Sequence, residues 1–502
     1  MGIVFRQSLK GSIVNLAGAF IGFLTTFFVI THLLTPEEIG LTRVLVEAAT
    51  LVGGYALLAS NTSIVRYYPY FHTDDGTDGG FFRIVLAIPL FGIFIFGGLY
   101  LLLREPLVNY FAPDEGTDLF RRYYLVVLPL MVFSLYQTLL EVYCSLKSRI
   151  TCPKLSREVI LRLLLLVCYL LYGLKTIDFD HFILLFVFSY GMVTIITFGY
   201  AIKITPNALR NRILPVSDSV RRDFRHYTVF TLLSALGSSI IQRLDLFMVS
   251  SELGMAHAGI YSIAFYVVAV IEMPARSLSA MSSPIASQVL HQEDYQGLNI
   301  LFRKVSNNQL LLGMILLVII WVNIDTLFTI IPNGHIYAQG KWVVLFLGIG
   351  KLIDLSFSFG NAILRYSKHY YWTLAYTIIV LAVTILLNLY FISKWGISGA
   401  AIATMITLIV SYAFQQIVLW RKLQVSPLNR EMWQILLIFV ILMGTNWVLP
   451  HTQSLLFDSV WRTITIAFLG WLLLRSLPTF KRLIEHFDEA FRQLLTKYQR
   501  HE

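Results

Sequence analysis

The sequence predicts an all-α polytopic membrane protein with about 14 transmembrane helices. Of its 502 residues, 57% are hydrophobic and only 14% are charged, whereas soluble domains carry about 25% charged residues. Apolar runs of about 20 residues recur from end to end, and a helix of that length crosses the ~30 Å hydrocarbon core of a bilayer. The charged residues gather mostly in the short segments between these runs. Together these observations exclude a soluble multidomain protein.

The apolar runs define the predicted spans in chain order. They cover roughly 11–34, 41–64, 82–103, 123–145, 158–174, 182–203, 228–251, 256–281, 308–331, 341–363, 371–392, 397–420, 432–449 and 459–477. The chain opens on a short basic lead without a signal-peptide cleavage site, so the first run is expected to be retained as the first span.

The longest hydrophilic connection separates two sets of six spans. The predicted organisation is an N-terminal six-helix bundle, a cytoplasmic linker, a C-terminal six-helix bundle, two additional transmembrane helices and a cytoplasmic amphipathic tail helix, at 1–203, 204–226, 227–420, 431–477 and 478–502. TPEEIGLTRVLV and GMAHAGIYSIAF open the second span of each set, and both place a glycine before an apolar run. Such parallel repeats are a common plan of transporters.

Orientation follows from the basic residues. Most of the 39 Lys and Arg lie in the tails and in the loops on the N-terminal side of the membrane, and basic loops stay cytoplasmic. Both termini are therefore expected in the cytoplasm. The same bias accounts for the net charge of +10, which needs no nucleic-acid partner.

Other kinds of chemistry find little support in the sequence. The three cysteines, Cys144, Cys152 and Cys168, show no CxxC spacing, so neither a disulfide framework nor a metal site is expected. No Walker, GxGxxG, HExxH or GxSxG motif occurs in a fitting context. We therefore expect no cofactor, and no ATP-driven transport by this chain alone.

Charges inside the spans are the candidate functional residues, because intramembrane ions are costly and face a cavity or a partner. Three acid–base pairs have the i,i+3 or i,i+4 spacing of one helix face: Arg43 with Glu47, Glu272 with Arg276, and Lys351 with Asp354. Pro274 lies inside the second pair and should kink its helix. Two alternatives stay open, namely that Arg43 snorkels to the interface and that Lys351 and Asp354 form a structural ion pair.

Arg243 and Asp245 lie two residues apart in the seventh span. Two helical residues are about 200° of rotation apart, so these side chains point to different sides and need other partners. Glu47 and Glu272 are candidate partners for Arg243. A water-filled cavity between the halves is expected, with Asn15, Asn61 and Gln242 as further polar lining.

Three stretches resemble one family of membrane proteins. LLTPEEIGLTRVL (33–45), with NTSIVRYYP (61–69), resembles the first two spans of bacterial polysaccharide-exporting flippases, although Thr35 replaces a glycine and Ile39 an aromatic residue. RLDLFMVSSELGMAHAGIYSIAF (243–265) resembles their seventh and eighth spans, and KWGISGAAIATMIT (394–407) their twelfth. The sequence thus resembles the oligosaccharide flippase family of the multidrug/oligosaccharidyl-lipid/polysaccharide exporter superfamily.

The resemblance implies two pseudo-symmetric six-helix bundles plus two C-terminal helices, in a bacterial inner membrane. It implies a flippase, not an enzyme, that moves undecaprenyl-pyrophosphate-linked oligosaccharide to the periplasmic leaflet for O-antigen, lipopolysaccharide or capsule assembly. A glycan polymerase and glycosyltransferases of the pathway would be its partners.

A sugar pyrophosphate needs cations in a polar cavity. The candidates for that role are Arg243, Arg276, Arg43 and Lys351, while the candidates for ion coupling or pairing are Asp245, Glu272, Glu47 and Asp354.

Three other functions remain as alternatives. A multidrug cation antiporter of the same superfamily would need an acidic cavity, and five basic residues inside the spans favour an anionic substrate instead. Sequence motifs alone poorly distinguish a peptidoglycan-precursor flippase from an oligosaccharide flippase. A membrane glycan polymerase would need a long periplasmic loop, and the longest expected outer connection is only 104–122.

Overall fold

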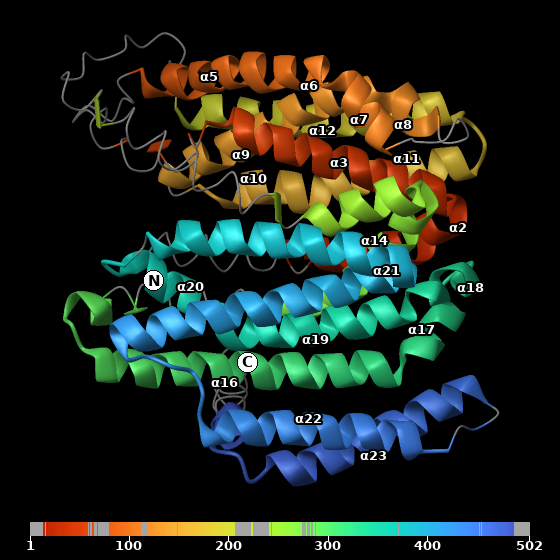
Figure 1. The fold of residues 1–502 in the computed structure, drawn as a ribbon. Helices are drawn as coiled ribbons and strands as arrows, with labels where there is room; N and C mark the ends of the chain where they lie inside the picture. Colours follow the sequence, from red (N-terminus) through yellow and green to blue (C-terminus); the bar gives the residue numbers. More distant parts are fainter. Residues whose placement is uncertain are drawn as a thin grey trace, which may run out of the picture. The chain divides into compact units, whose positions relative to one another are not determined.

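The computed structural model is helical throughout the part of the chain that it describes (Figure 1). It describes residues 14–15, 17–58, 60, 63–64, 68, 80–111, 118–147, 149–205, 222–223, 240–241, 243–273, 278, 282, 285–286, 288–369, 371–450, 452 and 454–485. Ten helices in these ranges are long and apolar enough to cross a membrane. The prediction of an all-α polytopic membrane protein is confirmed. The seventh predicted span lies largely outside the described residues, so the count of fourteen stays a prediction.

The chain divides into two compact units, Met1–Ile263 with Ile331–Asn333, and Ala264–Ile330 with Gly334–Glu502. Unit 1 contains η1 Thr25–Ile30, α2 Thr31–Leu33, α3 Pro36–Ala56, α5 Phe81–Gly92, η3 Ile93–Gly97, α6 Gly98–Leu102, α7 Arg104–Phe111, α8 Asp118–Tyr123, η4 Tyr124–Val126, α9 Val127–Leu146, α10 Thr151–Leu155, η5 Ser156–Ile160, α11 Leu161–Gly173 and α12 Phe179–Ile204.

Helix α14 (Met255–Ala269) crosses the division between the units. Unit 2 continues with η6 Val270–Glu272, α16 Tyr295–Val322, α17 Ile324–Ile330, α18 Gly334–Tyr337, η7 Ala338–Gly340, α19 Lys341–Phe357, α20 Phe359–Tyr366, α21 Trp372–Leu423, α22 Arg430–Val448 and α23 Leu455–Leu474. Most of the predicted linker 204–226 lies outside the described residues, so the predicted domain boundaries stay predictions.

Helix α3 begins earlier than the predicted span 41–64 because its first turn is capped. The Thr35 hydroxyl accepts from the Glu38 amide at 3.3 Å, and the Glu38 carboxylate accepts from the Thr35 amide at 2.8 Å. This reciprocal capping box satisfies two otherwise unpaired donors, and Pro36 at the first helical position is pre-set for the helix. Arg43 therefore lies about two turns inside the helix.

Helix α16 also begins before its predicted span, 308–331. The Asp294 carboxylate caps it by accepting from the Gly297 amide at 2.8 Å, so the polar stretch before the apolar run joins the same helix. The helix ends at Val322, where the Asn323 side chain donates to the carbonyl of Ile319.

A sharp break inside α21 separates two spans. Trp395 (φ −127°, ψ 16°) and Gly396 (φ 55°, ψ −137°) leave the helical region, and glycine takes positive φ at little cost. Gly399 follows, and a Cβ there would lie 1.9 Å from the carbonyl oxygen of Phe391. The predicted division between 371–392 and 397–420 is confirmed, and the glycines of KWGISGA make it sterically feasible.

In unit 1, the first turns of α3 and α14 meet backbone to backbone. A Cβ on Gly40 would lie 1.8 Å from the carbonyl oxygen of Met255, and a Cβ on Gly259 would lie 2.0 Å from that of Pro36. These glycines are the two that open the second span of each predicted repeat. Small residues of this kind let helices approach closely in membranes.

Candidate functional site

Two arginines of unit 1 share one carboxylate. Arg43 Nη2 lies 2.8 Å from Glu47 Oε1 on the same face of α3, and Arg243 Nε lies 2.8 Å from Glu47 Oε2. All three side chains are mostly buried: Arg43 is 24% exposed, Arg243 16% and Glu47 17%. Within this trio one carboxylate thus contacts two guanidiniums, one on α3 and one on the described helical stretch 243–253.

Asp245, two residues after Arg243, contacts α14. Its carboxylate accepts a hydrogen bond from the Tyr261 hydroxyl of α14 at 3.2 Å. Arg243 and Asp245 thus contact two different helices, α3 and α14, as their angular separation requires. Of the two expected acidic partners of Arg243, the structure brings Glu47 to it.

Unit 2 holds a second charged cluster. The Lys351 ammonium of α19 contacts Glu272 of η6, and it lies 4.0 Å from Asp354 one turn along the same helix. The Asp354 carboxylate also accepts from the Tyr412 hydroxyl of α21. Lys351 therefore contacts two carboxylates, and its charge is already compensated within the protein.

The remaining predicted residues divide into two groups. Asn15 is exposed on a short described helical stretch and contacts none of the residues above. Asn61, Gln242 and Arg276 lie outside the described residues, as does Pro274 with its expected kink.

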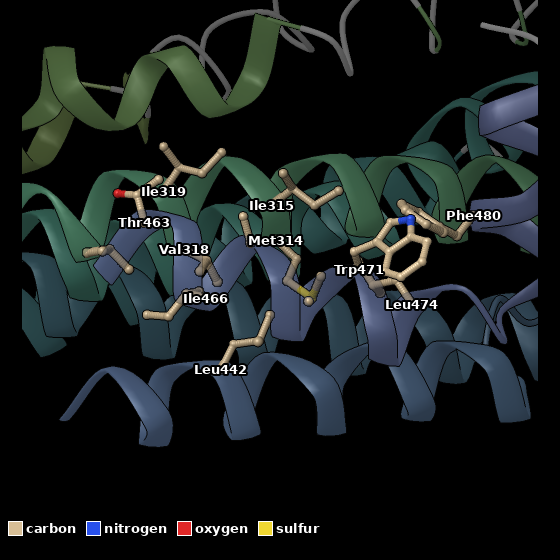
Figure 2. A pocket seen from close by; sticks show the side chains of 13 residues that line it. Met314, Ile315, Val318, Ile319, Leu442, Thr463, Ile466, Trp471, Leu474 and Phe480 are labelled. Carbon is tan, nitrogen blue, oxygen red and sulfur yellow. The ribbon is translucent and has the colours of Figure 1, made fainter. Parts of the chain in front are cut away.

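An apolar groove with a volume of about 210 Å³ runs along the C-terminal helices of unit 2 (Figure 2). Its walls come from α16, α22, α23 and the segment after α23: Met314, Ile315, Val318, Ile319, Val322, Leu442, Thr463, Ile466, Ala467, Gly470, Trp471, Leu474 and Phe480. The one polar side chain among these, Thr463, exchanges hydrogen bonds with Asn323 at 2.9 and 3.2 Å. From Thr463 to Leu474 the groove extends about 16 Å along α23, and hydrocarbon is what it can hold.

Polar contacts join the surrounding helices near both ends of this groove. At one end the Asn323 carbonyl oxygen of α16 accepts from the hydroxyls of Ser459 and Thr463 on α23. At the other end Glu431 of α22 accepts from the Asn307 amide of α16 at 2.9 Å and from the backbone amide of Thr479 at 2.6 Å. These contacts fix α22 and α23 to α16.

Sequence reasoning did not single out Arg462. Its side chain on α23 is buried, 3.5 Å from Asp458 Oδ2, and it donates to the carbonyl of Asn446 on α22. The acid–base spacing of i,i+4 in FDSVWRT is the signal that identifies such a pair. The pair joins the two helices of the hairpin.

No family model matches the sequence, and no curated protein matches it. Solved structures do. The lipid II flippase MurJ in an inward closed conformation is 14% identical with a TM-score of 0.68, and the match covers 93% of this chain and 99% of that one.

Two MATE transporters also match. An inward-facing multidrug resistance MATE family transporter of the MOP superfamily is 14% identical with a TM-score of 0.58, over 82% of this chain and 98% of its own. The Vibrio cholerae MATE transporter VcmN is 15% identical with a TM-score of 0.56, over 84% and 96%. The chain therefore has the fold of MOP-superfamily flippases and transporters.

Proposed function

We propose that this protein is a flippase for undecaprenyl-pyrophosphate-linked oligosaccharide, acting in a bacterial inner membrane with both termini in the cytoplasm. The observation that carries the proposal is the trio on α3 and the Arg243 helix, where Glu47 serves two arginines. A pyrophosphate is a ligand that two neighbouring guanidiniums complement, because arginines bind phosphate oxygens through paired, charge-assisted hydrogen bonds.

The apolar groove supports the same substrate class. A polyprenyl chain is insoluble in water and needs only hydrocarbon contact, and the groove along α23 offers a nearly unbroken apolar wall. Sugar hydroxyls and phosphates cannot cross hydrocarbon without polar partners. The groove thus suits the apolar part of such a substrate, whereas the arginines suit its pyrophosphate.

A cationic drug is the competing substrate, since MATE transporters share the fold. The acidic balance of the Glu272, Lys351 and Asp354 cluster is the feature that would suit it. The two arginines of unit 1 argue against it, because bringing a cation to them costs several kcal/mol at short range in a partly buried site.

Transbilayer movement in proteoliposomes tests the proposal. A fluorescent polyprenyl-pyrophosphate oligosaccharide is incorporated, and a membrane-impermeant glycan-modifying enzyme added outside reports how fast the protected pool becomes accessible. Arg243→Ala should slow movement more than tenfold, because a charge-assisted hydrogen bond contributes about 1.5–3 kcal/mol. It should also abolish surface-glycan export in cells at normal protein abundance.

Arg365→Gln is the matched control, since Arg365 is an exposed arginine at the end of α20. It should move substrate like the unaltered protein. Wild-type movement by Arg243→Ala would overturn the assignment, and so would a protein that exports cationic dyes and ignores the lipid-linked glycan.

A further inference from the structure

A second apolar crevice lies in unit 1, between α5, α9 and α12. Its volume is about 510 Å³, within the range of small-molecule sites. Leu90 of α5 and Ile195 of α12 stand on its rim, 58% and 68% exposed. Neither charged cluster contributes to its walls, so the crevice is separate from the site described above.

The polar groups of its wall are already engaged. The Tyr136 hydroxyl donates to the carbonyl of Leu86 at 3.0 Å. The Thr194 hydroxyl lies 2.9 Å from the carbonyl oxygen of Tyr190 and 3.0 Å from that of Phe133. The interior therefore presents hydrocarbon and leaves no hydrogen-bonding group in need of a ligand.

Arg83, in the first turn of α5, is the one charged residue that lines the crevice. Its side chain is exposed, and within the described ranges no carboxylate or carbonyl contacts its guanidinium. Helices α9 and α12 both end near this level, at Leu146 and Ile204. An arginine thus sits where an apolar crevice meets the end of its helices.

We propose that this crevice binds one anionic phospholipid, with the phosphate on Arg83 and one acyl chain in the crevice. From Arg83 to Leu90 the crevice runs about 10 Å along α5, which fits within the ~15 Å depth of one leaflet of the hydrocarbon core. The positive charge selects lipids with a net negative head group, as basic pockets between transmembrane helices do. The phospholipid is a resident of the protein rather than its cargo.

Native mass spectrometry of the purified full chain tests this. Dioleoyl phosphatidylglycerol should bind in one tight copy, ahead of dioleoyl phosphatidylcholine. Arg83→Gln should weaken phosphatidylglycerol binding about fivefold, the equivalent of one basic residue near anionic lipid, and leave phosphatidylcholine unchanged. Ala87→Phe, at an exposed position of the crevice wall, should weaken both lipids.

Leu90→Trp on the exposed rim is a second variant that blocks the crevice, for use if Ala87→Phe does not fold. Arg365→Gln is the control for the loss of one surface charge. The proposal fails if Arg83→Gln binds phosphatidylglycerol normally, or if the blocking variant that folds leaves both lipids bound. Displacement of phosphatidylglycerol by equimolar undecaprenyl phosphate would assign the crevice to the polyprenyl chain and overturn it as well.

Discussion

Neutralising Glu47 should destabilise unit 1 strongly, although the substitution Glu47→Gln is nearly isosteric. Each arginine nitrogen lies 2.8 Å from a Glu47 oxygen, so the charge centres are about 4 Å apart. At the effective dielectric constant of a protein near its surface, that distance corresponds to ~4 kcal/mol for each pair. Desolvation and partial exposure reduce this figure, so the expected loss is about 3 kcal/mol, at the lower end of values for breaking a buried ion pair.

Arg243→Gln in the same chain should recover part of that loss, because it removes one of the two guanidiniums left facing each other. The coupling between Glu47 and Arg243 in a double-mutant cycle is expected at about 1–3 kcal/mol, the range for residues in direct contact.

Thiol labelling during denaturant titration supplies the assay. Cys144 and Cys168 are buried and unpaired, so a thiol-reactive dye reports unfolding directly, and Cys152 can be replaced by serine to lower the background. Asn15→Ala is the control for an exposed polar residue. An unchanged midpoint for Glu47→Gln, or a double variant whose loss equals the sum of the single losses, would refute the shared-carboxylate argument.

Two further substitutions probe packing. Gly40→Leu should lower stability by about 1–3 kcal/mol because its side chain meets the Met255 carbonyl. Gly54→Ala on the same helix, with open space around it, should melt no lower than the unaltered protein, because alanine is the better helix former. Equal melting temperatures for both variants would contradict the close approach. Arg462→Met should lower the free energy of unfolding by about 3–5 kcal/mol, because it removes the arginine that pairs with the Asp458 carboxylate. Adding Asp458→Asn should recover much of that loss in the same unfolding measurement. A double variant that keeps the full loss would contradict the prediction.

Helix type, the approximate positions of most spans and the break at Trp395–Gly396 could be predicted from the sequence, because apolar runs and a glycine at a turn are local signals. The start of α16 could not, since its first turns are polar and become helical through the Asp294 cap. Periodicity also identified the pairing of Arg43 with Glu47, which depends only on positions along one helix.

Contacts between helices were harder to predict. Glu47 and Glu272 were equal candidates for Arg243 from the sequence, and only the packing of α3 distinguishes them. Lys351 was a candidate for substrate phosphate, behind Arg243 and Arg276, yet Glu272, distant in sequence, compensates its charge. Arg462 was not among the candidates, and its contact with the Asn446 carbonyl of α22 depends on the packing of two helices.

The contacts that fix α22 and α23 to α16 bear on how transport would be driven. Asn323 of the segment after α16 and Glu431 of α22 make these contacts near the two ends of the groove. If both contacts persist in the inward-facing and outward-facing states, the groove keeps one width in both. A polyprenyl chain bound there would have the same affinity in each state. A ligand with equal affinity for two states shifts no population between them. The polyprenyl chain would then contribute to the residence time of the substrate, while the head group alone would shift the equilibrium between the inward-facing and outward-facing states.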